Sequence, residues 1–193
     1  MRANPIGRTG LRGRGRLGRW GPNRAVDALV TRWKRDEHGN LEVHPESGKP
    51  IMQFVAIQRT DTGEWAIPGG FPRLKEGMSQ TLWREFLEEA LQGQGMENGE
   101  RQDILNRTAH FFNNGALLYR GYVDDPRNTD DAWLETVAYH LHDAEGDAVQ
   151  QLQLKAGSDA KGVAWLDARK ELDLYASHER ILQMAVEAVQ AHW

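Results

Sequence analysis

The hydrophobic and polar positions of this chain follow two different periods. Short runs rich in Val, Ile, Leu and aromatic residues, bounded by Gly, Pro, Asp or Asn, indicate β-strands. Such runs lie at residues 26–33, 51–59, 64–68, 116–123, 133–142 and 162–167. Apolar residues three or four positions apart predict helices at 79–91, 101–112 and 177–192. Ser79 is the expected N-cap of the first helix, and the Gly- and Pro-containing stretch 69–79 before it is expected to be a loop.

The helix expected at residues 79–91 has two contrasting sides. Its apolar residues gather on one face and Glu85, Glu88 and Glu89 are expected on the opposite face. Like charges at this spacing weaken a helix unless something binds them. The glutamates are therefore either a solvated acidic stripe or a site for a cation. The apolar face consists of Leu82, Trp83, Phe86, Leu87, Ala90 and Leu91.

Length and composition limit the class of protein. The chain has 193 residues, of which 39% are hydrophobic, so one domain over residues 1–193 can bury a core of ordinary size. It has no cysteine, which excludes disulfides and thiolate metal sites. No apolar run approaches the roughly 18 residues of a membrane span, and no signal-peptide pattern opens the chain. We expect a soluble protein.

Charge is distributed unevenly along the chain. Residues 1–35 carry ten Lys and Arg and one acid, Asp27, a charge of +9, so the remainder carries −13 to reach the total of −4. One interpretation is a disordered Arg/Gly tail that contacts nucleic acid. The other is an Arg- and Gly-rich segment, within residues 1–50, that packs on the core and offers N–H groups to a phosphate ligand. The apolar strand that follows directly favours the second.

A longer pattern surrounds the acidic helix. It reads Gly, five residues, Glu, seven residues, Arg-Glu, an apolar residue, any residue and Glu-Glu. Within residues 70–92 this arrangement resembles the signature box of the Nudix hydrolase superfamily. Leu91 and Gln92 stand where the box usually ends in Gly and an aliphatic residue, and Lys75 stands where Gly commonly precedes the first Glu. The matching positions are Gly70, Glu76, Arg84, Glu85, Glu88 and Glu89.

The Nudix resemblance implies an α/β fold in which a mixed β-sheet is sandwiched between α-helices. It also implies pyrophosphate hydrolysis, in which divalent cations neutralise phosphate charge and activate water. Mg²⁺, with Mn²⁺ as a substitute, prefers such oxygen ligands. Glu76 and Arg84 are expected to pair and brace the loop. Glu89 is the nominal general base, and Glu135 or an acid in a mobile loop is the alternative. The resemblance makes Arg84, Glu85, Glu88 and Glu89 catalytic, and Gly70, Glu76, Glu85, Glu88 and Glu89 metal-binding.

Motifs outside the box narrow the substrate class. "NPIGRTGLRGRG", "VTRWK", "EWAIPGG", "GYVDDPRNTDDAW" and "LYASH" resemble the ADP-ribose pyrophosphatases of the mitochondrial type. They are equally similar to the C-terminal, ADP-ribose-recognising domain of a melastatin-type TRP cation channel, and the resemblance runs over residues 4–193. It implies Mg²⁺-dependent hydrolysis of ADP-ribose to AMP and ribose 5-phosphate. The residues it places in the cleft are Asn4, Arg8, Asp125, Arg127, Tyr175, Ser177 and His178.

Alternatives stay open for these cleft residues and for the function. Asp125 and Arg127 could form a turn, Tyr175 could belong to the core, and Ser177 could only cap the last helix. The intact "REFLEE" favours hydrolysis, whereas a non-hydrolysing ADP-ribose sensor or an enzyme for another nucleoside diphosphate compound would share the cleft.

The setting of the chain is equally open. We expect an excised channel domain on the cytoplasmic side of a membrane, with the rest of a tetrameric channel as its partner. We expect no contact with nucleic acid and no direct contact with the membrane. The alternative is a stand-alone enzyme of the mitochondrial matrix without its N-terminal lobe.

Overall fold

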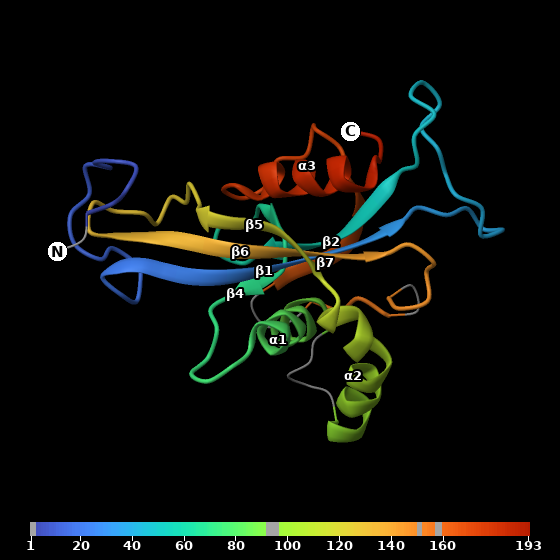
Figure 1. The fold of residues 1–193 in the computed structure, drawn as a ribbon, viewed down its shortest axis with the longest axis horizontal. Helices are drawn as coiled ribbons and strands as arrows, with labels where there is room; N and C mark the ends of the chain where they lie inside the picture. Colours follow the sequence, from blue (N-terminus) through green and yellow to red (C-terminus); the bar gives the residue numbers. More distant parts are fainter. Residues whose placement is uncertain (1–2, 92–96, 150–151, 157–159) are drawn as a thin grey trace.

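A computed structural model describes residues 3–91, 97–149, 152–156 and 160–193, and its centre is one mixed β-sheet between helices (Figure 1). The sheet has seven strands in the order β3-β2-β1-β6-β5, with β4 paired to β1 and β7 to β2. Helix α3 covers one face, whereas α1 and α2 lie on the other, which confirms the expected α/β sandwich. The strands are β1 Gly21–Trp33, β2 Met52–Arg59, β3 Trp65–Ala66, β4 Gly69–Gly70, β5 Ala116–Tyr122, β6 Ala132–Asp143 and β7 Ala160–Asp167. The helices are α1 Met78–Ala90, α2 Asn98–Asn113 and α3 His178–Val189.

The long strands β1 and β6 form the parallel centre of the sheet. Their register runs from Gly21 opposite Ala132 to Arg32 opposite Asp143. The other strand pairs are antiparallel. This pairing explains why β1 begins at Gly21 rather than at the predicted residue 26, because β6 supplies partners for the polar residues that precede the apolar run.

Alternation along β1 divides the core into two layers. Val26, Ala28 and Val30 pack in the layer that contains α1, and Leu29 packs in the layer that contains α3. The apolar faces predicted for α1 and α3 are confirmed, with Trp83 and Val189 only partly buried. The core residues of α1 are Leu82, Phe86, Leu87 and Ala90, and those of α3 are Ile181, Leu182, Ala185 and Val186.

Three local predictions were wrong. Gly69 and Gly70 are not loop residues, because they pair with Asp27 and Val26 of β1. Helix α1 begins at Met78 with Gly77 as its N-cap, two residues before the predicted N-cap Ser79, and the Gly77 amide donates to Gln80 Oε1 at 3.0 Å. Helix α2 begins at Asn98, three residues before the predicted start. Gln92, the last residue of the signature box, lies outside the described residues.

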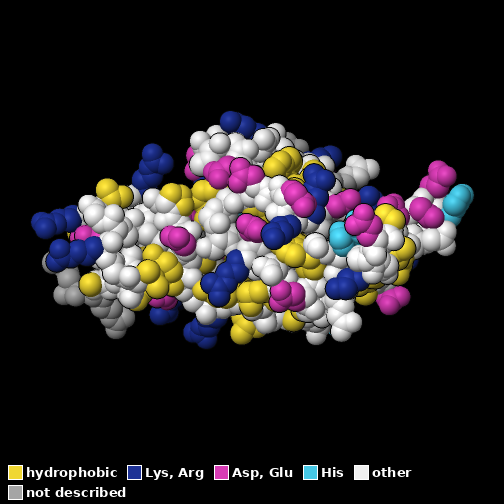
Figure 2. Space-filling model, turned by 90° about the horizontal axis from the view of Figure 1, so that it is seen from above, with side chains coloured by type: hydrophobic (Ala, Val, Ile, Leu, Met, Phe, Trp, Pro, Cys, Tyr) yellow, Lys and Arg dark blue, Asp and Glu magenta, His cyan; other side chains and the backbone are white. Residues whose placement is uncertain are grey.

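The Arg- and Gly-rich segment before β1 is bonded to the connection between β5 and β6. The Asn4 amide donates to the Asp130 carbonyl at 2.9 Å, and the Gly13 amide donates to Asp131 Oδ2 at 2.7 Å. Thr129 Oγ1 in turn donates to the Gly13 carbonyl at 2.6 Å. These bonds join segments more than 100 residues apart and hold the segment against the fold. Figure 2 shows Lys and Arg side chains gathered at this end of the molecule. Within the described residues, no helix is both long and apolar enough to cross a membrane.

Candidate active site

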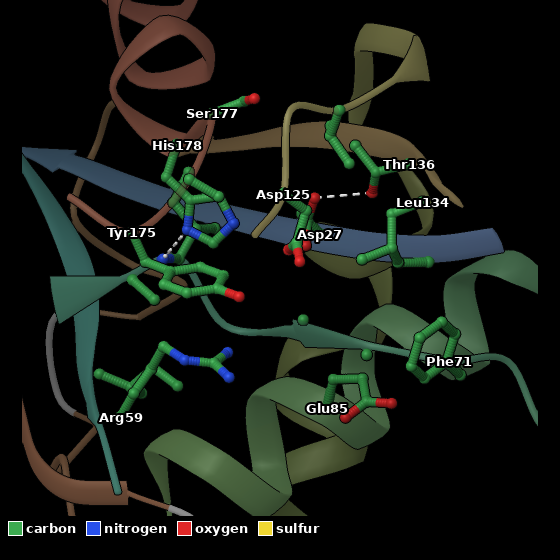
Figure 3. A pocket seen from close by; sticks show the side chains of 18 of the residues that line it. Asp27, Arg59, Phe71, Glu85, Asp125, Leu134, Thr136, Tyr175, Ser177 and His178 are labelled. Atoms are coloured by element: carbon green, nitrogen blue, oxygen red, sulfur yellow. Dashed lines mark hydrogen bonds between the residues drawn. The ribbon is translucent and has the colours of Figure 1, made fainter. Parts of the chain in front are cut away.

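A cavity of about 400 Å³ lies where the sheet, α1 and the start of α3 meet (Figure 3). Strands β1, β2 and β6, the β3–β4 turn, the loop after β5 and the residues around the α3 N-terminus all contribute to its wall. Its polar and charged lining residues are Asp27, Arg59, Glu85, Glu89, Asp125, Arg127, Thr136, Tyr175, Ser177 and His178. The structure therefore brings the box helix and the "DDPR" and "YASH" motifs into one space.

Helix α1 contributes Glu85 and Glu89 to this cavity. The Gly69 amide donates to Glu89 Oε2 at 3.0 Å, and Glu85 is only 8% exposed. A Cβ atom at residue 70 would lie 2.6 Å from Glu85 Oε2, so only glycine lets the carboxylate approach β4 this closely. Although these glutamates were expected on the face opposite the apolar one, both turn toward the sheet and line the cavity. A solvated acidic stripe is excluded for Glu85.

Arg84 is the hub of an ion-pair network beneath the cavity. Its Nε and Nη2 donate to the two carboxylate oxygens of Glu76 at 2.7 and 3.0 Å, so the expected pair is present. Arg84 also lies 2.8 Å from Glu85 and 3.2 Å from Glu88. Arg73 Nη2 donates to Glu88 Oε1 at 3.0 Å. Glu85 and Glu88 therefore have arginine counter-charges within the chain.

The loop that carries Glu76 holds a non-glycine residue in a backbone conformation that favours glycine. Lys75, which stands where Gly is common, has a φ of 67°, in the left-handed region that favours glycine. The Arg73 amide and Thr81 Oγ1 donate to Glu76 Oε2 at 2.9 and 3.1 Å. Together with Arg84 these donors lower the pKa of Glu76 to about 2.

The remaining glutamate of the box, Glu89, has a buried carboxyl group whose charge would not be balanced by an ion pair with a described residue. Burial is the main reason why its pKa rises to about 8, and the nearby Glu85 and Asp27 carboxylates add to the rise. Burial also raises the pKa of Glu85, against the influence of Arg84. Among the described residues, Glu89 has no ion pair with an arginine or lysine. Two buried carboxylates one turn apart thus face the same cavity with too little positive charge.

This donor set fits a hard divalent cation. Mg²⁺ commonly takes one or two carboxylates and completes its shell with waters and substrate phosphate oxygens, which Glu85 and Glu89 allow. Within the part of the chain that the structure describes, no three His, Asp or Glu side chains form a ready-made metal cluster. Glu76 and Glu88 are instead bound to arginine.

Asp125 and Arg127 are bound to each other on the opposite wall. Arg127 Nε and Nη2 donate to the two Asp125 oxygens, both at 2.8 Å, and the Arg127 amide donates to Oδ1 at 2.9 Å. Both Asp125 carboxylate oxygens are thus engaged with Arg127. The pair holds a guanidinium at a fixed place in the cavity, with its remaining N–H groups available.

The "YASH" motif lies at the start of α3. Tyr175 is buried, and Ala176 has a φ of 51°, so the backbone reverses between Tyr175 and His178 and both side chains line the cavity. The Ile67 amide donates to His178 Nδ1 at 2.9 Å, and burial lowers the pKa of His178. The neutral ring therefore carries its proton on Nε2 and is a hydrogen-bond donor. Ser177 occupies the N-cap position, but its hydroxyl accepts from the Asp124 amide at 3.0 Å.

Three sequence-based candidates belong neither to the cavity lining nor to the Arg84 network. Asn4 is buried, donates to the Thr129 carbonyl at 3.0 Å and accepts from the Ile6 amide, so it anchors the N-terminal segment. Arg8 is exposed on that segment. Glu135 turns to the other side of β6, where it accepts from Trp133 Nε1 at 3.1 Å and lies 3.8 Å from Arg24.

The lining residues that sequence reasoning missed include Asp27, Arg59, Phe71 and Thr136. Thr136 Oγ1 donates to Asp27 Oδ2 at 2.7 Å, and burial raises the pKa of Asp27. An acid inside the apolar run "VDALV" and an arginine at the end of the apolar strand 51–59 were the available signals. Both residues interrupt a hydrophobic pattern, which is unfavourable unless the site uses them.

No protein-family model matches the chain. It is 53% identical, over 191 residues, to the mitochondrial ADP-ribose pyrophosphatase of Rattus norvegicus, and the match covers 98% of this chain and 55% of that protein. It is 48% identical, over 180 residues, to a transient receptor potential cation channel subfamily M member-like 2 of Nematostella vectensis, covering 93% of this chain and 11% of that one.

Solved structures agree at the level of the fold. A MutT/nudix family protein from Enterococcus faecalis superposes with a TM-score of 0.58 at 21% identity, covering 88% of this chain and 62% of that one. The chain thus spans about half of the pyrophosphatase that it resembles and about a tenth of the channel.

Proposed function

We propose that this chain is a Nudix hydrolase that hydrolyses ADP-ribose to AMP and ribose 5-phosphate with a divalent metal ion. One observation carries the proposal: Glu85 and Glu89 of α1, Asp125 and Arg127 of "DDPR", and the "YASH" residues line the same cavity of about 400 Å³. The similarity to a mitochondrial ADP-ribose pyrophosphatase supports this choice of substrate.

Glu85 and Glu89 would hold the metal ion, with Mg²⁺ as the proposed ion and Mn²⁺ as a substitute. When bound, such an ion neutralises phosphate charge and makes water a better nucleophile. The side chains of Glu76 and Glu88 support the site indirectly, since both bind Arg84. Arg84 thereby fixes the loop before α1 to the helix that carries the metal ligands.

Glu89 is the proposed general base. Its Oε2 is held by the Gly69 amide, which orients the carboxylate beside the cavity. A pKa of about 8 in the metal-free chain gives it a high proton affinity near neutral pH. Glu135 is the weaker choice because its side chain does not line the cavity.

The opposite wall would orient the substrate. Arg127, held by Asp125, offers N–H donors to a phosphate oxygen, and His178 Nε2–H is a second donor. The Tyr175 ring provides an apolar face for a ribose or a base. Ser177, Asn4 and Arg8 are assigned no direct contact, because the first binds Asp124 and the other two lie outside the cavity lining.

Two settings fit this activity. We propose a domain of an ADP-ribose-gated cation channel, on its cytoplasmic side and with the remainder of a tetrameric channel as partner. Its alternative is an ADP-ribose pyrophosphatase of the mitochondrial matrix. The channel relative at 48% identity supports the first setting, and the mitochondrial pyrophosphatase at 53% identity supports the second. Expression of the full-length gene, followed by localisation of its product, distinguishes them.

A non-hydrolysing ADP-ribose sensor is the second candidate function. The observation in its favour is that Glu85 and Glu88 are already paired with arginine, without a ready-made metal cluster in the described part of the chain. A sensor needs ligand binding and no turnover.

Measuring AMP formation from ADP-ribose, with and without Mg²⁺, distinguishes the hydrolase from the non-hydrolysing sensor. The unmodified chain is compared with a Glu85→Gln, Glu89→Gln double variant and with a surface control, Glu171→Gln, Glu187→Gln. We expect Mg²⁺-dependent turnover from the chain and the control, and none from the cavity variant. Calorimetric binding of ADP-ribose without turnover by the unmodified chain would support the sensor instead.

A further inference from the structure

Arg59, at the end of β2, is held by the aspartate of the following turn. Its Nε donates to Asp61 Oδ1 at 2.9 Å and its Nη2 donates to Asp61 Oδ2 at 2.7 Å. The guanidinium carbon lies 4.1 Å from the centroid of the Tyr175 ring. Figure 3 shows the guanidinium below Tyr175, pointing into the cavity. A bidentate ion pair and an aromatic face thus fix both ends of one cationic group.

The charges around the cavity make Arg59 different from Arg127. Both arginines line the cavity, and the lining contains four acids: Asp27, Glu85, Glu89 and Asp125. Arg127 is neutralised inside the cavity by Asp125. The partner of Arg59 is Asp61, which does not line the cavity and whose side chain is 49% exposed. Solvent screens this outer charge, so Arg59 contributes positive potential to a cavity that otherwise has an excess of acid.

The remaining donors of Arg59 have a suitable geometry for phosphate. A guanidinium has five N–H groups, and Asp61 takes one from Nε and one from Nη2. Three remain, two of them on Nη1. A planar fork with adjacent donors matches phosphate oxygens better than the single ammonium of lysine does. In Figure 3, Glu85 lies across the floor of the cavity from Arg59, so a diphosphate between them would meet the proposed metal site on one side and Arg59 on the other.

We propose that Arg59 binds a phosphate oxygen of the diphosphate substrate, and that Asp61 is a positioning residue that holds the guanidinium against Tyr175. This inference rests on the proposed function, because it assigns a contact within the same site. It also gives the "DTG" turn at residues 61–63 a role beyond connecting two strands.

The test uses the unmodified chain and three variants, Arg59→Gln, Arg59→Lys and Asp61→Asn. The matched control is Arg180→Gln, since Arg180 also lies over a tyrosine, 5.9 Å from the Tyr119 ring, but outside this cavity. Binding of ADP-ribose is measured by calorimetry without metal, and kcat and KM with Mg²⁺. Circular dichroism and thermal unfolding show whether each variant is folded.

We expect Arg59→Gln to weaken ADP-ribose binding by about 10- to 100-fold, with Arg59→Lys intermediate. Asp61→Asn is the more discriminating variant. If Asp61 acted only through its charge, its removal would strengthen the binding of an anion. The positioning role predicts the opposite, a roughly three- to tenfold loss of affinity for ADP-ribose, seen mainly as a rise in KM.

Wild-type affinity in Arg59→Gln, or tighter binding in Asp61→Asn, would overturn the inference while leaving hydrolysis by the unmodified chain intact. Absence of both binding and turnover in the unmodified chain would overturn the proposed function and this inference with it. Binding without turnover would overturn only hydrolysis, since the affinity of the Arg59 variants still tests the contact.

Discussion

Gly70 lies directly against the Glu85 carboxylate, so that a Cβ atom at residue 70 would be 2.6 Å from Glu85 Oε2. We predict that Gly70→Ala displaces Glu85 and lowers kcat for ADP-ribose by at least about 10-fold, because misplaced catalytic groups lose rate steeply. Gly18→Ala is the control, since a Cβ atom there meets nothing within 4 Å. Steady-state kinetics of both variants check the prediction, and full activity of Gly70→Ala would show that the position of Glu85 is unimportant.

The Glu76–Arg84 pair predicts a stability effect. Glu76 has a pKa of about 2, below its ordinary value of 4.5, so its ionised form stabilises the folded chain above pH 4.5 and this contribution is lost as the pH falls toward 2. Glu76→Gln leaves the buried Arg84 with one partner fewer. We expect a loss of about 3 kcal/mol in the free energy of unfolding at pH 7.

Urea denaturation at pH 7 and at pH 3.5 measures this loss. The difference between Glu76→Gln and the unmodified chain should shrink at the lower pH. Glu37→Gln, at an exposed position, should change little at either pH. An equal difference at both pH values would contradict the role of the Glu76 charge.

Replacing Glu89 is expected to raise the stability of the metal-free chain and to abolish its activity. Its pKa of about 8 in the folded chain lies above the ordinary value, so stability present below pH 4.5 is lost as the pH rises through 8. Glu89→Gln removes that dependence. Without metal, the variant should unfold at a higher temperature than the unmodified chain, by an amount that grows from pH 5 to pH 9, although it hydrolyses no ADP-ribose.

Thermal unfolding in EDTA across this pH range tests the effect of Glu89. Addition of Mg²⁺ at pH 8 should stabilise the unmodified chain and leave the variant nearly unchanged, because the carboxylate is a proposed ligand. A Glu89→Gln variant that is less stable at pH 9 would refute the assignment of a costly buried charge.

A histidine pair at the far end of the central strands predicts acid sensitivity. Thr31 Oγ1 lies 2.7 Å from His140 Nε2 and 2.8 Å from His142 Nδ1, and His142 Nε2 is buried without a partner among the described residues. Burial lowers the pKa of His140 to about 4, and the nearby His142 adds to this shift. Stability is therefore present above pH 6.5 and is lost as the pH falls toward 4.

For His140 alone we expect a loss of about 2 kcal/mol between pH 7.5 and pH 5. His140→Gln should flatten this part of the profile, whereas His38→Gln at an exposed position should not. Asp143, Arg32 and Trp33 also lie near the pair and are unchanged in both variants. Chemical denaturation at the two pH values provides the comparison, and a profile that stays as steep in His140→Gln would be inconsistent with burial of a neutral ring.

Local pattern was sufficient for the main elements and for the box. Glu88 and Glu89 lie three and four residues after Glu85, and helical geometry brings residues at such spacings together without help from the remainder of the chain. The Glu76–Arg84 pair, which joins the loop before α1 to the helix, was expected from the family resemblance. The apolar faces of α1 and α3 followed from the 3.6-residue period for the same reason. Strand ends were less predictable, because pairing with β6 extended β1 into polar residues and pairing with β1 turned Gly69 and Gly70 into a strand.

By itself, then, the sequence determined the residue types and spacings of the box, the resemblance to ADP-ribose pyrophosphatases, and the approximate course of strands and helices. Tertiary structure decided which side chains share the cavity. Asp27 and Arg59 line the cavity, whereas Asn4, Arg8 and Glu135 lie outside its lining. Glu88 forms ion pairs with Arg73 and Arg84. These outcomes depend on strand register and on contacts such as Thr136 with Asp27, 109 residues apart, which local hydrophobic period does not specify.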